Sequence, residues 1–267
     1  MDLISANYGS NTLSVLTNNG QGGFVLTSSS DVGFQPVSLI AADMNGDGRV
    51  DLISANYGSN TLSVLTNNGK GGFVLAATPG VGFEPVSLAA ADVNGDGLVD
   101  LISANYGSNT LSVLTNNGRS GFALSSTLGV GTAPMFVVAA DVNGDGPVDL
   151  MSANSWDDTL TVLTNNGSGG MTLAATPGVG SQPIFLVATD VNRDGRPDLI
   201  TANYGDNTLT VLTNAPAFIS HFTGDGAGLV NVPASAITGG LTTNVAVLLP
   251  NGTHTFFFTN GLLMKIQ

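Results

Sequence analysis

The sequence predicts an all-β protein, built as a β-propeller-like array of four-stranded antiparallel blades with a small β-rich C-terminal tail. Three observations predict it. A 49-residue repeat runs through most of the 267 residues, each period holds short β-type runs separated by Gly and Asn turns, and no 11-residue stretch of the repeat has helical periodicity. Four antiparallel strands in about 50 residues, repeated, are typical of propeller blades. A β-sandwich or an open β-solenoid is the alternative.

The repeat predicts the number of blades. Its first two copies, residues 2–26 and 51–75, agree at 24 of 25 positions, and the third copy, 100–124, differs from the second at three. A fourth copy begins at Asp149 and a fifth at Asp198. Such close identity means that each copy solves the same packing problem. Counting partial units, we expect about five blades, of which the middle three are complete and the terminal ones incomplete.

Each period contains four runs rich in Val, Leu, Ile and Thr. Asn68-Gly69 is a strong hairpin signal, because both central residues of a type I′ turn need positive φ, and we expect that turn here. Pro79–Gly82 reads as a loop before the last run. In the second period the runs cover residues 50–56, 61–66, 73–76 and 85–91.

The chain divides into two regions. Residues 1–214 hold the repeat, which opens at the second strand of one blade and stops after the third strand of another. Residues 215–267 read as a Gly-rich linker and a β-rich C-terminal segment that serves closure of the blades or assembly with another subunit. Strands are expected there at residues 245–249, 253–258 and 262–266.

A nine-residue acidic loop recurs four times, at residues 43–51, 92–100, 141–149 and 190–198, and we name these segments acidic loops 1 to 4. Oxygen-bearing side chains occupy positions 1, 3, 5 and 9, Gly occupies position 6, and position 7 varies. Variation at position 7 is expected if that residue contributes only its backbone carbonyl. Pro147 at this position is informative, because proline keeps the carbonyl and loses the N–H.

Hard oxygen ligands at alternating positions, with a Gly for the sharp turn, are typical of a Ca²⁺ loop. Mg²⁺ requires stricter octahedral geometry, and transition metals prefer nitrogen or sulfur ligands. Twelve of the 19 acidic residues lie in the four loops, where a divalent ion would offset their repulsion. The alternative is an Asx turn without metal, which four copies that keep every ligand position disfavour. We therefore predict about four Ca²⁺ ions, one in each loop.

The predicted ligands stand at positions 1, 3, 5, 7 and 9 of each loop. They are Asp43, Asn45, Asp47, Arg49 and Asp51, Asp92, Asn94, Asp96, Leu98 and Asp100, Asp141, Asn143, Asp145, Pro147 and Asp149, and Asp190, Asn192, Asp194, Arg196 and Asp198. Asp2 occupies position 9 of a further loop whose first eight positions are absent. We therefore expect either that the sequence is a fragment or that it begins where another segment supplies the missing inner strand.

The acidic loop followed by Asp-Leu-Ile-Ser-Ala-Asn resembles the FG-GAP (VCBS-type) repeat of integrin α-chain propellers and bacterial surface proteins. The likeness covers about residues 1–214. It implies a calcium-binding β-propeller in which each ion lies between the inner two strands of a blade. The sequence departs from the family at its Gly-Ala-Pro position, which reads Ala-Asn-Tyr-Gly. It also has fewer blades than is usual for the family, so the resemblance predicts the blades but not their closure into a ring.

Composition excludes several classes of function. Lys and Arg total 6 against 19 Asp and Glu, for a net charge of −13, so we expect no nucleic-acid binding. No apolar run approaches the ~18 residues of a membrane span, and we expect no membrane insertion. The chain has no Cys and only two His, His221 and His254, both in the tail. Because no catalytic constellation is visible, we expect that the protein is not an enzyme.

These features predict a non-enzymatic, calcium-stabilised scaffold or adhesion module. An extracellular or cell-surface location is expected, because oxygen loops of modest affinity fill where Ca²⁺ is millimolar. We expect self-association, head-to-tail or by strand exchange into filaments, since an incomplete blade is a template for an added strand. The alternative is a lectin-like propeller with a glycan or protein ligand. Its candidate contacts are Trp156 and the repeated Tyr8, Tyr57, Tyr106 and Tyr204.

Overall fold

A computed structural model describes the protein over residues 2–119, 121–214, 244–249, 252–259 and 262–266. These residues form 21 β-strands and no helix, and within them nothing has the length and apolar character of a membrane-crossing helix. The chain separates into two compact units, Met1–Asn214 and Ala215–Gln267.

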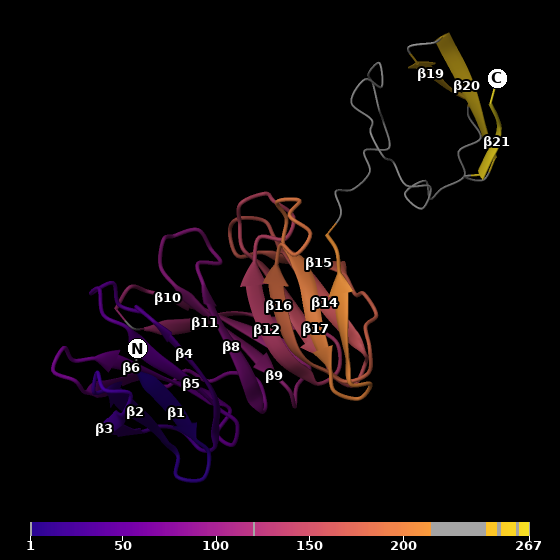
Figure 1. The fold of residues 1–267 in the computed structure, drawn as a ribbon. Coiled ribbons are helices and arrows are strands. Elements are labelled where there is room, and N and C mark those ends of the chain that lie inside the picture. Colours follow the sequence, from indigo (N-terminus) through magenta and orange to yellow (C-terminus); the bar gives the residue numbers. More distant parts are fainter. Residues whose placement is uncertain (1, 120, 215–243, 250–251, 260–261, 267) are drawn as a thin grey trace. The chain divides into compact units, whose positions relative to one another are not determined.

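The first unit consists of five antiparallel sheets, here named blades 1 to 5, which follow one another in chain order (Figure 1). The prediction of an all-β array with three complete central blades and an incomplete blade at each end is confirmed. Blade 1 contains β1 (Leu3–Asn7), β2 (Thr12–Asn18) and β3 (Phe24–Asp31). Blade 2 contains β4 (Pro36–Ala42), β5 (Asp51–Asn56), β6 (Thr61–Asn67) and β7 (Phe73–Ala77). Blade 3 contains β8 (Pro85–Ala91), β9 (Asp100–Asn105), β10 (Thr110–Asn116) and β11 (Phe122–Gly129). Blade 4 contains β12 (Pro134–Ala140), β13 (Asp149–Asn154), β14 (Thr159–Asn165) and β15 (Met171–Ala175), and blade 5 contains β16 (Pro183–Thr189), β17 (Asp198–Asn203) and β18 (Thr208–Leu212).

The second unit contains one three-stranded antiparallel sheet. Its strands β19 (Asn244–Leu249), β20 (Gly252–Thr259) and β21 (Leu262–Ile266) confirm the three strands predicted for the tail. The predicted Gly-rich linker, with His221, and the two connecting turns lie outside the described residues.

Neighbouring blades pack face to face through the same apolar positions. Between blades 2 and 3, Leu62 and Val64 lie in a buried cluster with Leu101 and Leu114, and equivalent clusters join the other neighbouring blades. The second strand of each complete blade is buried at all six residues, because it is covered on both faces. A strand covered on both faces reads as a continuous run rather than an alternating one, as Asp-Leu-Ile-Ser-Ala-Asn does.

Blade 5 leaves one of these faces exposed. Leu111 and its equivalents in blades 2 and 4 are fully buried, whereas the equivalent Leu209 is 70% exposed and Val211 is 50% exposed. The residue types and their places in the strand are the same. Their different burial therefore comes from the neighbouring blade alone.

The turn between the third and fourth strands differs from the prediction. Asn68 donates its N–H to the carbonyl of Gly72 (3.0 Å), which closes a longer loop than a two-residue type I′ turn. Positive φ falls on Gly69 and Gly71, at 69° and 84°, and not on Asn68. The Asn68 side chain instead accepts hydrogen bonds from the N–H groups of Lys70 and Gly72. The type I′ expectation was wrong because the asparagine stabilises the turn through its side chain.

Buried asparagines hold the other end of the strands. The Asn56 side chain accepts a hydrogen bond from the Ser54 hydroxyl and donates one to the Ser63 hydroxyl, which also accepts the N–H of Gly33 from the preceding connection. A Cβ at Gly33 would lie 2.6 Å from Asn56 Nδ2, so only glycine fits there. Blades 3 and 4 repeat this arrangement. The asparagine of the Ala-Asn-Tyr-Gly segment, such as Asn56, therefore holds the neighbouring strands together at the position where the family it resembles has Gly-Ala-Pro.

Equivalent leucines in two blades allow burial to be separated from local sequence. We expect Leu111→Ala to lower the free energy of unfolding by about 2–5 kcal/mol, because it opens a cavity between blades 3 and 4. Leu209→Ala removes the same atoms from an exposed site and should change it by less than about 0.5 kcal/mol. Urea unfolding followed by circular dichroism measures both values. Equal losses in the two variants would contradict the packing described above.

Candidate metal centre in the acidic loops

Each acidic loop connects the first and second strands of one blade. Loop 1 follows Ala42 at the end of β4 and leads into β5 at Asp51, and these two residues are paired in the sheet. Gly46 at position 4 and Gly48 at position 6 have φ of 73° and 81°. Two left-handed residues so close together turn the backbone sharply, which glycine allows without steric cost.

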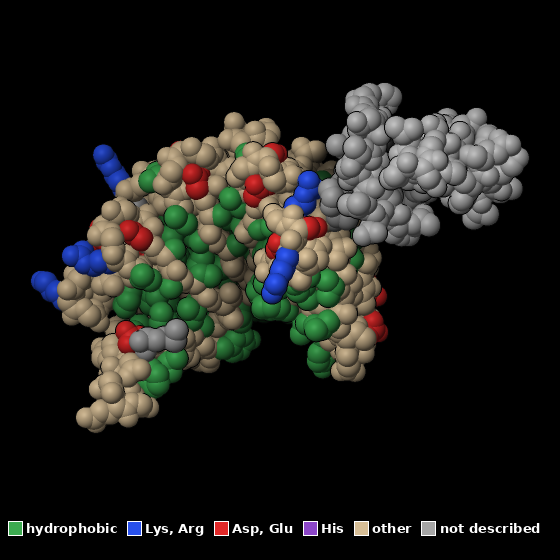
Figure 2. Space-filling model, turned by 45° about the horizontal axis from the view of Figure 1, so that its top comes forward, with side chains coloured by type: hydrophobic (Ala, Val, Ile, Leu, Met, Phe, Trp, Pro, Cys, Tyr) green, Lys and Arg blue, Asp and Glu red, His purple; other side chains and the backbone are tan. Residues whose placement is uncertain are grey.

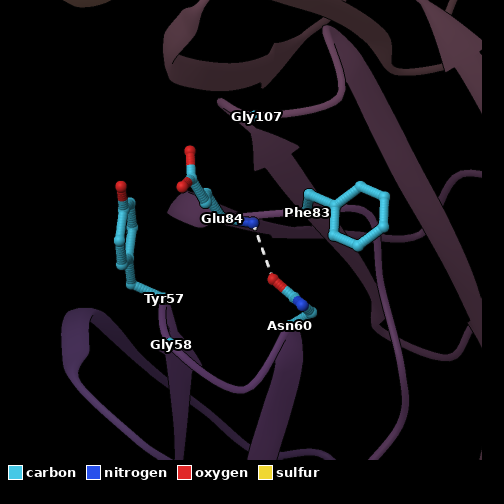
Figure 3. A pocket seen from close by; sticks show the side chains of 6 residues that line it. All are labelled: Tyr57, Gly58, Asn60, Phe83, Glu84 and Gly107. Atoms are coloured by element: carbon cyan, nitrogen blue, oxygen red, sulfur yellow. Dashed lines mark hydrogen bonds between the residues drawn. The ribbon is translucent and has the colours of Figure 1, made fainter.

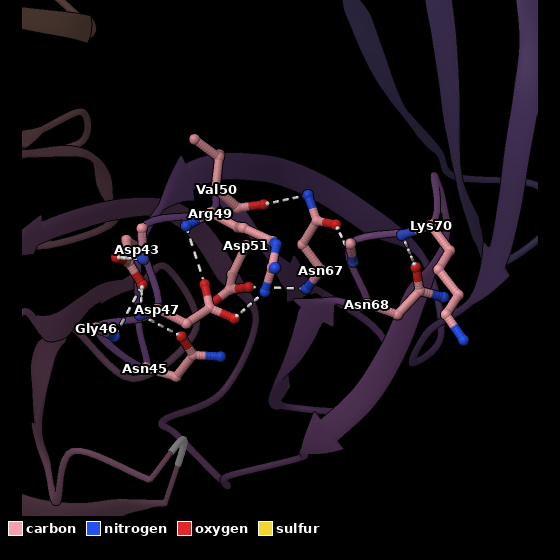
Figure 4. Close-up of polar contacts among 12 residues, drawn as sticks. Asp43, Asn45, Gly46, Asp47, Arg49, Val50, Asp51, Asn67, Asn68 and Lys70 are labelled. Carbon is pink, nitrogen blue, oxygen red and sulfur yellow. Dashed lines mark hydrogen bonds and ion pairs between the residues drawn. The ribbon is translucent and has the colours of Figure 1, made fainter.

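The carboxylate at position 1 organises the turn. In loop 1, Asp43 Oδ1 accepts hydrogen bonds from the N–H groups of Gly46 (2.8 Å) and Asp47 (3.2 Å), and Oδ2 accepts one from Gly48 (2.8 Å) (Figure 4). The N–H of Gly48 is the largest cause that lowers the pKa of the Asp43 carboxyl below its ordinary value. The same set of three bonds forms at Asp92, Asp141 and Asp190.

Positions 3 and 5 carry the more exposed oxygens. Asn45 Oδ1 accepts the N–H of Asp47 (3.0 Å), and Asp47 Oδ1 accepts the N–H of Arg49 (2.9 Å). The Arg49 guanidinium also pairs with Asp47 Oδ2 at 3.1 Å, the single ion pair in the part of the chain that the structure describes. In loops 2 to 4 the side-chain amide of the Asn at position 3 donates instead to Oδ2 of the Asp at position 5. Loops 2 and 3 contain no Lys or Arg, so no cation of their own offsets their three carboxylates.

Position 9 is a fully buried carboxylate at the start of the second strand. Asp51 Oδ2 accepts the N–H of Met44 (3.0 Å), and Oδ1 accepts the N–H of Asn67 (2.8 Å) at the end of β6. The equivalent residues Asp100, Asp149 and Asp198 make the same two bonds.

Burial is the largest cause that raises the pKa of the Asp100 carboxyl above its ordinary value. The charges of Asp96 and Asp92 act in the same direction, while hydrogen bonds from Asn116 and Val93 oppose it. A divalent cation nearby would favour the ionised form of all three carboxylates.

An asparagine at or just after the end of the third strand links each of loops 1 to 3 to the next blade. Asn116 donates its side-chain amide to the carbonyl of Val99 in its own blade (2.9 Å) and to that of Met44 in loop 1 (2.8 Å), 72 residues away. Asn165 repeats this with Val148 and Val93, and Asn214 bonds to Val142 in the same way. Sequence reasoning missed this role. The only signal was that the asparagine recurs in every copy.

Neighbouring loops also share a hollow. Loops 2 and 3 and the turn after β14 line a pocket of about 370 Å³, to which Asp92, Gly146 and Asn165 contribute. Seen from one side, acidic side chains lie at separate places on the surface rather than as one patch (Figure 2), as expected for one acidic loop to a blade.

The donor set fits a hard divalent cation. An ionised carboxylate has about four lone-pair sites, so Asp47 and Asp51, which accept two bonds each, keep capacity for a metal. The position 7 carbonyls accept no hydrogen bond from the described residues. Over those same residues, no three His, Cys, Asp or Glu side chains are gathered into a metal-binding group. Ligation by all three carboxylates of a loop would therefore require side chains to turn from backbone N–H groups toward the ion.

The family model of the FG-GAP-like repeat matches the chain four times, at residues 1–54, 43–103, 92–152 and 141–201. The protein belongs to the FG-GAP-like repeat family. Each matched segment contains at least one whole acidic loop, and the resemblance seen in the sequence is confirmed. No curated protein matches this FG-GAP-like chain.

Solved structures share the fold at low sequence identity. A protein from Lactobacillus plantarum is 19% identical with a TM-score of 0.54, over 79% of this chain and 66% of that one. The periplasmic gluconolactonase PpgL of Pseudomonas aeruginosa is 15% identical with a TM-score of 0.58, over 79% of this chain and 62% of that one. A putative 6-phosphogluconolactonase from Bacteroides uniformis is 12% identical with a TM-score of 0.55, over 98% and 79%. The FG-GAP-like chain thus spans less than two thirds of the first two proteins.

The expectation that the protein is not an enzyme is overturned. Of the solved structures with this fold, one is named as a gluconolactonase and one as a putative 6-phosphogluconolactonase. The expectation came from the near absence of His and the lack of Cys, and a propeller can place carboxylates and hydroxyls from several blades together without any motif in the sequence. The missing motif therefore does not exclude catalysis.

Loop 4 contains a strained residue that allows a test of the loop geometry. Arg193 stands at position 4 with φ of 64°, where the other loops have glycine. We expect Arg193→Gly to raise the free energy of unfolding by about 1 kcal/mol, because glycine adopts this conformation without strain. Arg196→Gly removes the same charge from the same loop at a residue without positive φ, and should bring no gain. Chemical denaturation distinguishes the two, and an equal gain would attribute the effect to charge instead.

Proposed function

We propose that this FG-GAP-like protein is a calcium-stabilised extracellular scaffold or adhesion module. One observation carries the proposal: the buried Asp at position 9 joins its own loop to the third strand, and the Asn of that strand reaches the loop of the preceding blade. A cation that orders one loop would therefore order parts of two neighbouring blades. Calcium would then determine how firmly the array is held together.

The energies involved are large enough for such a role. A site whose dissociation constant is 100-fold below the ambient calcium concentration stabilises the fold by about 2.7 kcal/mol. Four such sites would together contribute about as much as the net stability of an ordinary domain, roughly 5–15 kcal/mol. Extracellular modules of this chemistry have dissociation constants of about 10⁻⁴–10⁻³ M, which millimolar calcium saturates.

Calcium removal tests this proposal. We expect a chelator to lower the melting temperature by at least about 10 °C, because it removes the binding free energy of four sites. Isothermal titration should give about four ions for the unaltered chain and about three for Asp145→Asn, with dissociation constants in the range of extracellular modules. Asp31→Asn removes one charge outside the loops and should leave the number of ions unchanged. An unchanged melting temperature would contradict the proposal, and submicromolar affinity would contradict the extracellular location.

We also propose that the module associates with copies of itself. The support is the exposed face of blade 5. In blades 1 to 4 the equivalent face is buried against the following blade, in clusters that contain Leu52, Leu101, Leu150 and Leu199 of that following blade. Leu3 of blade 1 is the equivalent of these four residues, and it is also exposed. Blade 1 of one copy thus offers the surface that blade 5 of another lacks, which would give a head-to-tail contact.

Mixing two variants tests the direction of this contact. We expect Leu209→Asn and Leu3→Asn each to abolish self-association measured by light scattering, because each removes one of the two faces. A mixture of the two should form dimers, since each variant keeps the face that the other has lost. Leu173→Asn changes an exposed leucine of an outer strand and should leave association intact. Association that survives both changes would favour strand exchange, and a monomer throughout would contradict self-association.

A further inference from the structure

The ends of the strands opposite the acidic loops carry exposed aromatic side chains. Phe34 and Phe83, in the connections that lead into blades 2 and 3, are 66% and 64% exposed. Trp156 and Tyr204, in the corners of blades 4 and 5, are 68% and 69% exposed, and the Trp156 ring lies edge-on to Tyr106 at 6.0 Å between centroids. Several exposed aromatic rings on the loops of one end are typical of a binding surface.

One pocket of about 380 Å³ lies among these loops, between blades 2 and 3. Figure 3 shows the Tyr57 ring on one side, the Phe83 ring on the other and the Glu84 carboxylate between them. Asn60 lies below Glu84, and the two remaining lining residues are Gly58 and Gly107. The pocket therefore combines aromatic walls with a small number of polar groups, as sites for small ligands do.

The pocket is held rigidly before any ligand binds. Glu84 and Asn60 both have φ of 56°, and the N–H of Glu84 donates to Asn60 Oδ1 at 2.9 Å. The N–H groups of Tyr106 and Gly107 donate to the carbonyls of Glu84 (2.9 Å) and Phe83 (3.0 Å). The equivalent residues at the other junctions between blades, such as Asn11 and Gln35, also have positive φ, so the repeat itself fixes the backbone on which the pocket is built. Such preorganisation reduces the entropy lost on binding.

Glu84 is unusual in this sequence. It is the only glutamate, and it has no ion-pair partner among the described residues. A Cβ at Gly107 would lie 2.8 Å from Glu84 Oε2, so the glycine makes room for the carboxylate. Burial, followed by the neighbouring Glu84 carboxylate, raises the pKa of the Tyr57 hydroxyl.

We propose that this pocket binds a saccharide. A sugar ring presents an apolar C–H face that packs on an aromatic ring, here Phe83 or Tyr57. Its hydroxyls can donate to the Glu84 carboxylate in charge-assisted hydrogen bonds and accept from the side-chain amide of Asn60, which donates no hydrogen bond to the described residues. A cationic group would also match the rings and the carboxylate, but it offers no acceptor to the amide.

The proposal is independent of the calcium proposal, because the acidic loops lie at the other end of the strands. The repeat supplies natural variants of the pocket on the same backbone. The connection between blades 1 and 2 carries Phe34-Gln35 at the equivalent positions, whereas the connection between blades 3 and 4 carries Thr132-Ala133. The double variant Phe83→Thr/Glu84→Ala therefore introduces residues that this chain already accepts there, and it should fold normally.

Saturation-transfer NMR with methyl glycosides of glucose, galactose, mannose and N-acetylglucosamine tests the pocket in the full chain. We expect at least one glycoside to bind the unaltered protein, and the double variant to weaken that binding at least about tenfold, as loss of an aromatic anchor does. Glu84→Gln, which copies Gln35, should weaken it less than the double variant. Phe24→Ala removes an exposed aromatic ring from an outer strand and should leave binding unchanged.

Tetramethylammonium serves as the cationic probe in the same experiment. Binding of this ion with no binding of any glycoside would overturn the saccharide proposal. Glycoside binding of undiminished affinity in the double variant would also overturn it, because the sugar would then occupy another site. The absence of any glycoside signal from the unaltered, folded protein would overturn it as well.

Discussion

A buried carboxylate at the start of each second strand is the constraint on which the rest of the structure depends. Asp51, Asp100, Asp149 and Asp198 are fully buried, and each accepts one N–H from its own loop and one from the end of the third strand. A buried charge is costly unless its hydrogen bonds are made. Loop, second strand and third strand are therefore held in one arrangement, which places the other loop oxygens at the same edge of every blade.

The strand ends at the acidic loops differ from the opposite ends in which residues repeat from blade to blade. At the acidic end the loop oxygens recur in every acidic loop, and asparagines of the following blades bond to backbone carbonyls of loops 1 and 2. At the other end, buried Asn and Ser side chains hold the backbone, while exposed positions such as Phe83 and Glu84 differ from blade to blade. A fixed backbone with variable exposed side chains lets one interface acquire a pocket without disturbing the others.

Much of the fold and of the candidate centre could be predicted from the sequence, because the signals are local. Strand positions follow from apolar runs bounded by Gly and Asn, and the acidic loops follow from oxygen-bearing residues at alternate positions. The turn after the third strand could not be predicted in detail, because the Asn68 side chain competes with the backbone for the same N–H groups. The pocket at Glu84 could not be predicted either, because its walls come from two blades.

The sequence by itself determined the repeat, the strands within it, and the identity and order of the loop oxygens, since these depend on residues close together in the chain. Tertiary structure alone decided which of several equivalent residues are buried, as Leu111 and Leu209 show. It also decided that Asn116 reaches Met44 in another blade. The physical reason is the same in both cases: burial and long-range hydrogen bonds depend on what packs against a residue, and identical repeats with different neighbours carry no local record of that difference.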